Sequence, residues 1–225
     1  MDDDSFATGL VRKYYNNGVL EQEYFVFNDM NEGPYRCYHD NGKLHIICNY
    51  VKGLIEEERR MYTPTGFLYF VASYINGERQ GELRTYFENT NHLQCQCYYK
   101  NNMLHGKAMY YTSYGCLREI IHYKEGIKHG INMRYNGPYI TEYNFYDNGD
   151  YHGECRTYYD TGELCSIMNY HYGRKHGEAR YYSIDGKLHS HYHFNNDKRV
   201  GLAIEYDFDT GTYNQFNIDE ITDTN

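Results

Sequence analysis

The segment Tyr123-Lys124-Glu125-Gly126-Ile127-Lys128-His129-Gly130 carries a pattern that recurs along the 225-residue chain. The same form, Tyr-x-x-Gly-x-x-His-Gly, occurs again at residues 146–153 and at residues 170–177. Similarity of a chain to itself at a fixed spacing indicates a repeat architecture, in which each unit packs mainly on its neighbours.

Glycines mark the period of this repeat. We call the final glycine of the pattern the repeat position. It is filled by Gly9, Gly33, Gly81, Gly106, Gly130, Gly153, Gly177 and Gly201, and Glu57 takes the place of glycine in one repeat. A turn glycine lies nine residues later, at Gly18, Gly42, Gly66, Gly115, Gly162 and Gly186. A third set lies four residues before the next repeat position, at Gly53, Gly77, Gly126, Gly149 and Gly173. Of the 21 glycines, only Gly137 and Gly211 are out of phase, so the chain is built from units of about 24 residues.

Tyrosines follow the same period. A first tyrosine ladder stands five residues after every repeat position, at Tyr14, Tyr38, Tyr62, Tyr86, Tyr111, Tyr135, Tyr158, Tyr182 and Tyr206. A second ladder stands seven residues before each new repeat position, at Val26, Tyr50, Tyr74, Tyr99, Tyr123, Tyr146, Tyr170 and Phe194. Because Leu, Ile, Val and Phe make up under a fifth of the chain, tyrosine must supply much of the buried area. Half of the 30 tyrosines lie outside the two ladders, and we expect a binding surface among them.

The spacing within each unit predicts β-strands. Leu44, Ile46, Cys48 and Tyr50 are two residues apart and therefore point to one face of an extended strand. Glycine-containing segments such as residues 39–42 and 76–77 supply the positive φ angles of tight turns. Turns every dozen residues leave no room for a crossover helix, so each unit is predicted to be an antiparallel β-hairpin.

The predicted fold class is all-β: an elongated antiparallel meander of repeated hairpins in a single-layer twisted sheet. Eight units and a partial one predict 16 to 18 strands in an array over residues 8–211, between an acidic lead-in (1–7) and a polar cap or tail (212–225). Two irregularities are expected within it. One extra residue at 89–92 predicts a longer turn, and a missing residue at 135–140 predicts a bulge or kink.

Composition excludes several classes of function. A net charge of −9 without any cluster of Lys and Arg disfavours nucleic-acid binding and gives no support for membrane association by charge. No run is long and apolar enough for a membrane-spanning helix, and the acidic start lacks the features of a secretory signal. Seven cysteines without framework spacing are typical of a reducing compartment, so a soluble, intracellular protein is expected.

The repeated Tyr-x-x-Gly-x-x-His-Gly form resembles the MORN repeat, in particular its 24-residue variant found in bacterial antitoxin-like proteins and in large DNA viruses of amoebae. Partial copies at residues 74–81 and 99–106 extend the resemblance over about residues 8–210. The chain departs from many MORN repeats in having no Trp, and it carries no attached catalytic domain. The resemblance implies a protein-interaction scaffold, or phospholipid binding as proposed for some members. The Asn-, Tyr- and Ile-rich composition mildly favours a viral origin, in which case the protein would act in the host cytoplasm or the virion.

Histidines offer the main candidates for chemistry. His105, His129, His152 and His176 each precede a repeat glycine, and at about 9–10 Å spacing they are interpreted as turn-packing residues. His189, His191 and His193 alternate along one predicted strand and share a face opposite Leu188, Tyr192 and Phe194. With His171 or a carboxylate, two of the three would suffice for a metal site, although solvent-facing imidazoles without a metal are the favoured interpretation.

No catalytic constellation is apparent. Cys95 and Cys97 lie in the apolar register of their strand and are interpreted as small buried residues, because no second cysteine pair lies at zinc-site spacing. The chain contains no nucleophile elbow, phosphate-binding loop or zinc-protease motif. The sequence therefore predicts no enzyme activity, no cofactor and no small-molecule substrate.

Three hypotheses of function follow from these observations. The leading one is a non-enzymatic repeat scaffold that binds a protein partner through exposed tyrosines. The alternatives are an antitoxin or immunity-type protein that neutralises a toxin, and a peripheral phospholipid-binding module.

Overall fold

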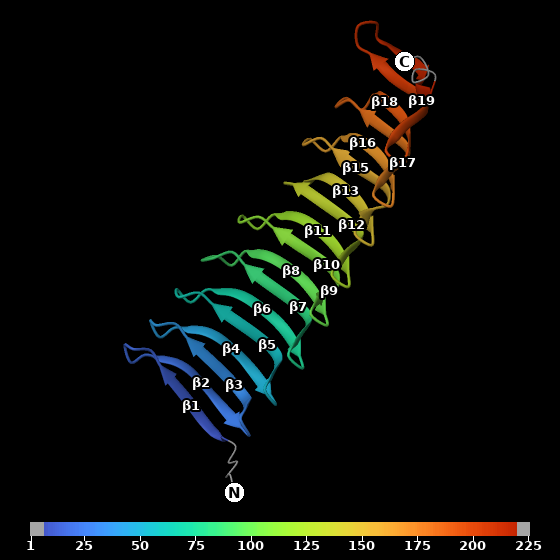
Figure 1. Ribbon diagram of the computed structural model, residues 1–225. Coiled ribbons are helices and arrows are strands. Elements are labelled where there is room, and N and C mark those ends of the chain that lie inside the picture. Colours follow the sequence, from blue (N-terminus) through green and yellow to red (C-terminus); the bar gives the residue numbers. More distant parts are fainter. Residues whose placement is uncertain (1–6, 220–225) are drawn as a thin grey trace. The chain divides into compact units, whose positions relative to one another are not determined.

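The computed structural model describes residues 7–219 (Figure 1). They form two compact units divided between Cys116 and Leu117. Both units consist almost entirely of β-strands, and within each unit consecutive hairpin arms pair antiparallel. Within residues 7–219 there is no helix long and apolar enough to cross a membrane. The predicted all-β hairpin fold is confirmed.

Unit 1 contains β1 (Gly9–Tyr14), β2 (Leu20–Phe27), β3 (Met30–Tyr38), β4 (Leu44–Val51), β5 (Leu54–Tyr62), β6 (Leu68–Ile75), β7 (Glu78–Tyr86), β8 (Leu93–Lys100), β9 (Met103–Leu104) and β10 (Gly106–Tyr111). Unit 2 contains β11 (Leu117–Lys124), β12 (Ile127–Asn136), β13 (Tyr139–Asp147), β14 (Asp150–Tyr151), β15 (Gly153–Tyr158), β16 (Leu164–His171), β17 (Arg174–Tyr182), β18 (Leu188–Asn195), β19 (Lys198–Asp207) and β20 (Thr212–Asn217).

The described residues thus contain twenty strands, more than the 16 to 18 predicted. The excess has a local cause, because β9 and β10 are one hairpin arm interrupted at His105, and both parts pair with β8. The same interruption at His152 separates β14 from β15, which both pair with β13. Counted as hairpin arms, the strands agree with the upper end of the prediction.

Two-residue turns close one end of the hairpins. In the turn formed by Asn76 and Gly77, both residues have positive φ angles, of 51° and 78°. This backbone conformation matches the twist of the flanking strands and identifies a type I′ turn. The turn at Tyr172 and Gly173 has the same conformation, with φ angles of 49° and 78°, although a bulky side chain is uncommon at its first position.

The repeat position lies in a β-bulge. In the pairing of β4 with β5, residues 57–59 face the single residue Cys48, and in that of β6 with β7, residues 80–82 face Ser73. The backbone at these bulges is left-handed, with φ of 95° at Gly81 and 64° at Glu57. Glycine adopts this conformation without strain, whereas a residue with a Cβ atom does not. Recurrence of the bulge explains why glycine recurs with the period of the repeat.

Longer turns close the other end of the hairpins. Most of them span five residues, and the turn between β7 and β8 has six, from residues 87 to 92, so the predicted longer turn is confirmed. Between β12 and β13 the turn shrinks to Gly137 and Pro138. A register shift does occur there, between Arg134 and Tyr135, but equivalent shifts occur in hairpins of normal length. The missing residue is therefore absorbed by the turn itself and not by a special kink.

Small and large side chains alternate across the buried face of the strands. Ala179 is fully buried between Met168 and Tyr192, its partners on the two adjacent strands, and Ala203 faces Phe216 in the same way. In unit 1, Ala72 and Cys97 occupy corresponding places, each opposite Leu83. The core is thus a continuous line of matched volumes within each unit.

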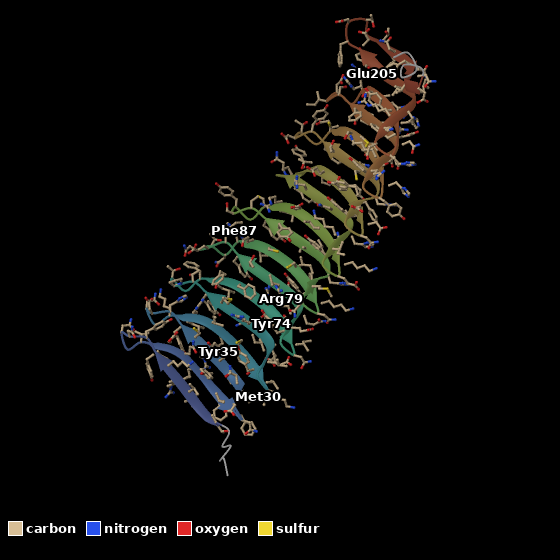
Figure 2. The ribbon with its side chains drawn as sticks, viewed as in Figure 1. Met30, Tyr35, Tyr74, Arg79, Phe87 and Glu205 are labelled. Carbon is tan, nitrogen blue, oxygen red and sulfur yellow. The ribbon has the colours of Figure 1, made fainter. Side chains whose placement is uncertain are left out.

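Tyrosines of the second ladder pack against tyrosines outside the ladders. Tyr146 is buried, and its ring centroid lies 4.7 Å from that of Tyr151, which in turn lies 5.1 Å from that of Tyr170. In unit 1, Tyr35 contacts Tyr50 at 5.7 Å, and its burial raises the pKa of its phenol to about 12. Tyr35 and Tyr74 lie along the unit 1 strands, between Met30 at the two-residue-turn end and Phe87 at the longer-turn end (Figure 2).

Only part of the predicted terminal segments can be compared with the structure. The predicted cap or tail begins with β20, which pairs with β19 from Leu202 to Asp207. A polar strand therefore covers the last repeat. The predicted acidic lead-in lies outside the described residues except for Ala7, as does the part of the predicted tail from residue 220 onward.

Replacement of Glu57 by glycine is expected to stabilise unit 1. Glu57 occupies a bulge whose φ angle of 64° is unfavourable for a residue with a Cβ atom. Relief of this strain, less the entropy that glycine adds to the unfolded chain, is expected to raise the free energy of unfolding by about 1 kcal/mol. Urea denaturation of E57G should show a higher midpoint with an unchanged slope.

The control is E57A, which removes the same carboxylate but keeps the strained backbone. Equal stabilisation by E57A and E57G would show that the side chain, and not the backbone conformation, is unfavourable at this position.

Candidate binding pockets

The residue directly after each first-ladder tyrosine occupies what we term the linking position, because in several repeats its side chain reaches the next repeat. The hydroxyl of Tyr15 donates a hydrogen bond of 2.8 Å to the carbonyl oxygen of Tyr38. His39 Nε2 donates at 2.8 Å to the carbonyl oxygen of Tyr62. In unit 2, the hydroxyl of Tyr159 donates at 2.7 Å to the carbonyl oxygen of Tyr182. Long side chains at this position therefore connect consecutive hairpins and fill the space between them.

Thr63 and Ser183 occupy the linking position with short side chains. Thr63 Oγ1 accepts a hydrogen bond of 3.1 Å from the backbone N–H of Phe67, within its own turn. Ser183 Oγ similarly donates to the carbonyl oxygen of Lys187 at 3.0 Å. Neither of these two side chains extends toward the next repeat, and a hollow lies beside each of them.

The hollow in unit 1 is an aromatic pocket of about 550 Å³. His39 and Phe87, the linking residues of the two flanking repeats, both line it, and Thr63 lies between them in the sequence of repeats. The remaining walls include Tyr62, Tyr69, Tyr86 and the carboxylate-bearing Glu88. A volume of this size suits a small ligand or a few side chains of a protein partner. We call this cavity the Thr63 pocket.

Both ladder and non-ladder tyrosines line the Thr63 pocket. Tyr62 and Tyr86 belong to the first ladder, whereas Tyr69 is one of the tyrosines outside the ladders. The expectation that a binding surface lies among the non-ladder tyrosines therefore describes only part of this cavity. Ladder residues become available because the linking residue next to them is short.

Two stacked histidines line one side of the Thr63 pocket. The ring centroids of His39 and His45 lie 4.2 Å apart with an interplanar angle of 27°. Burial lowers the pKa of His45, and the nearby His39 and Arg59 lower it further because they disfavour a second positive charge. The lowered pKa favours the neutral form of His45 in this wall, and Glu88 adds a carboxylate to the lining.

The hollow beside Ser183 forms a second cavity, of about 540 Å³, in unit 2. Tyr159, Tyr182 and His189 line it in the places that His39, Tyr62 and Tyr69 take in the Thr63 pocket, and Phe208 closes the side toward the next repeat. The two cavities therefore have the same structural origin and different wall chemistry.

The three alternating histidines of β18 do not act as one group. His189 lies in the cavity beside Ser183, with its ring centroid 5.3 Å from that of Phe208. His191 and His193 instead gather with Glu178 of β17. Glu178 is the cross-strand partner of His193. Its carboxylate therefore reaches His193 and His191, the next residue on that face, but not His189. A carboxylate, and not His171, joins the two histidines.

His171 belongs to the other histidine series. Its ring centroid lies 5.4 Å from that of His152 and 5.6 Å from that of His176, so it bridges two members of that row in unit 2. Tyr172 covers this group, 4.4 Å from His171. His129 faces Asp147 at 3.3 Å, and in unit 1 His105 interrupts the strand pairing between β9 and β10. These contacts are consistent with the interpretation of the row as turn-packing residues.

Cys95 and Cys97 lie where the sequence pattern placed them. Cys97 is buried in the core line opposite Leu83, and Cys95 is half-buried two residues before it. Hydrogen bonding between the two thiols lowers the pKa of Cys95 and raises that of Cys97. Their position in the core line agrees with the prediction of small buried residues.

Neither cavity was predicted from the sequence, although the chain differs in these repeats. Alignment of the repeats on their first-ladder tyrosines shows Thr63 and Ser183 where Tyr15, His39 and Tyr159 stand in other repeats. Thr112, Asn136 and Asp207 also stand at this position, so a residue without a ring does not by itself predict a hollow. The structure is needed to show which side chains span two repeats.

Comparison with known families agrees with the repeat assignment. The family model for the MORN repeat variant matches four segments of the chain, residues 7–28, 31–52, 151–172 and 175–196. A search of curated proteins gave no significant match.

Acidification is expected to destabilise unit 1 through His45. Because the pKa of His45 is lower in the folded than in the unfolded protein, the unfolded chain binds more protons below about pH 6.5. Stability is therefore unaffected above pH 7 and falls as the pH drops through 6.5 and through the lowered folded pKa. Thermal unfolding of wild type and H45Q at pH 7.5 and pH 5 should show a smaller decrease in Tm for H45Q. Equal decreases would contradict this assignment.

Proposed function

Since the chain contains MORN repeats of the variant type, we propose that it is a non-enzymatic scaffold that anchors a partner protein in the Thr63 pocket. The observation that carries this proposal is the aromatic cavity itself, which opens where one linking residue is short. Aromatic side chains and cavities that accept an anchoring residue are typical of protein interfaces.

The wall chemistry of the Thr63 pocket favours a particular kind of anchor. Tyr62, Tyr69, Tyr86 and Phe87 offer ring faces, which attract both apolar side chains and the cationic groups of Lys and Arg. Glu88 adds a carboxylate that favours a cationic end group. A partner that inserts an Arg or Lys side chain from a basic surface would also match the net charge of −9.

The polar groups of the pocket favour binding over catalysis. His39 is held by its hydrogen bond to the carbonyl oxygen of Tyr62 and stacks on His45, so neither ring is oriented by a carboxylate as a general base would be. Glu88 lines the pocket through its position on the longer turn between β7 and β8. These features support a scaffold without enzymatic activity.

Replacement of Thr63 by tyrosine tests the proposal directly. Tyr15 and Tyr159 already occupy the linking position in other repeats, so T63Y should fold and fill the cavity with its ring. Its hydroxyl would be placed to donate to the carbonyl oxygen of Tyr86, which would stabilise unit 1 by about 0.5–1.5 kcal/mol. We therefore expect unchanged or higher Tm together with loss of partner binding.

The measurement is a paired affinity purification from cells that naturally make the protein, followed by binding of the purified partner to each variant. S183Y is the matched control, because it fills the equivalent cavity of unit 2 and leaves the Thr63 pocket open. A partner that binds wild type and S183Y but not T63Y supports the proposal. Equal binding to T63Y would remove the pocket from the interface, and failure to recover any partner with wild type would argue against a scaffold.

A further inference from the structure

Glu178, His191 and His193 form a group of possible metal ligands on unit 2. One carboxylate oxygen and one ring nitrogen from each histidine all lie within 4.8 Å of one another. His193 Nε2 is 3.8 Å from Glu178 Oε1, and His191 Nε2 is 4.0 Å from Glu178 Oε2. The ring centroids of the two histidines are 5.0 Å apart. Two strands position the group, since β18 supplies both histidines and β17 supplies the carboxylate directly opposite His193.

The inner histidine of this group carries an unsatisfied nitrogen. His191 Nε2 is buried and has no hydrogen-bond partner among the described residues, although its side chain lies only 4.0 Å from a carboxylate. A buried polar nitrogen without a partner is costly unless another group satisfies it. Coordination of a cation by Nε2 would supply that missing interaction.

The Glu–Arg ion pair recurs in several repeats, whereas the histidine pair opposite Glu178 does not. A glutamate followed two residues later by an arginine recurs at the same place in four repeats, where Arg60, Arg84, Arg156 and Arg180 pair with Glu58, Glu82, Glu154 and Glu178. Opposite Glu82 the corresponding residues are Gln96 and Tyr98, and opposite Glu154 they are Ile167 and Asn169. Opposite Glu58 they are Val71 and Ser73, so among these four repeats only the one that contains Glu178 combines the carboxylate with two imidazoles. The ion pair is a general feature of the fold, whereas the histidines are an addition to it.

The ligand types indicate which ions would bind. Two imidazole nitrogens and one carboxylate oxygen suit Zn²⁺ and neighbouring divalent transition metals, and are a poor match for Mg²⁺ or Ca²⁺, which prefer oxygen ligands. Ligand bonds of about 2.0–2.2 Å require the three atoms to approach more closely than in the present arrangement. Glu178 and His193 are both 44% exposed, so small side-chain rotations can bring them together and leave a coordination position open to water.

Arg180 sets a limit on the affinity. Its guanidinium is paired with Glu178 Oε2, the same oxygen that faces His191. A metal ion must therefore compete with this ion pair for the carboxylate. Removal of Arg180 would free the carboxylate and also remove a positive charge beside the site.

We propose that Glu178, His191 and His193 form a three-ligand site for a divalent transition metal of the Zn²⁺ type on the surface of unit 2. The site is independent of the Thr63 pocket, which lies in unit 1 and shares no residue with it.

Isothermal titration of the full-length protein with ZnCl₂ tests this assignment. Wild type should bind one Zn²⁺ at this site with a Kd of about micromolar, while the double variant H191A/H193A should lose this binding event. E178Q, which removes the charge of an exposed side chain, should weaken it more than about tenfold. R180Q should strengthen it. Any Zn²⁺ bound by cysteines or other histidines would remain in every variant and is subtracted by comparison.

The matched control is E154Q, which changes the equivalent carboxylate of the Glu154–Arg156 pair, where no histidine stands opposite. Its titration should match that of wild type. Circular dichroism and Tm, measured without metal, show whether each variant is folded. If H191A/H193A is not folded, the loss of Zn²⁺ affinity in E178Q tests the proposal instead. Identical isotherms for wild type, E178Q and H191A/H193A, or no binding by wild type at micromolar Zn²⁺, would overturn the proposal.

Discussion

The repeating bulge is the constraint on which the rest of this structure depends. At each repeat position of β3, β5 and β7, three residues must face one residue of the adjacent strand, and the backbone passes through a left-handed conformation. Glycine fulfils this requirement without strain, which explains its spacing of about 24 residues. The bulge also sets the register, so that the first and second tyrosine ladders, the core line and the linking position recur at constant offsets.

A register that repeats so regularly makes each repeat a separate place for specialisation. Within each unit the strands pack mainly on the adjacent hairpin arms, so a substitution changes the volume and hydrogen bonding of two or three hairpins only. Thr63 illustrates the effect, since loss of one long side chain opens a cavity while the flanking His39 keeps its bond to Tyr62. The scaffold tolerates such sites because no central core has to be rebuilt around them.

Periodic features of the fold were predictable from the sequence, whereas features that join two repeats were not. The hairpins, the type I′ turn at Asn76 and Gly77, and the burial of Cys97 follow from spacing and local conformational preference. The hollow beside Thr63 depends on the reach of a side chain into the next repeat, which no local pattern encodes. The grouping of His191 and His193 with Glu178 required the cross-strand register, and His189 was excluded from it for the same reason.

The two proposed sites arise from the same architecture by opposite changes. In the Thr63 pocket a side chain that normally links repeats is shortened, and the exposed faces of ladder tyrosines become walls of a cavity. At Glu178 an ion pair common to several repeats is kept, and two imidazoles are added across the strand. Neither change replaces a bulge glycine, a residue of the two-residue turns or a residue of the core line. A hairpin array of this kind can therefore acquire binding sites one repeat at a time, since a substitution at the linking position or opposite the ion pair leaves those residues in place.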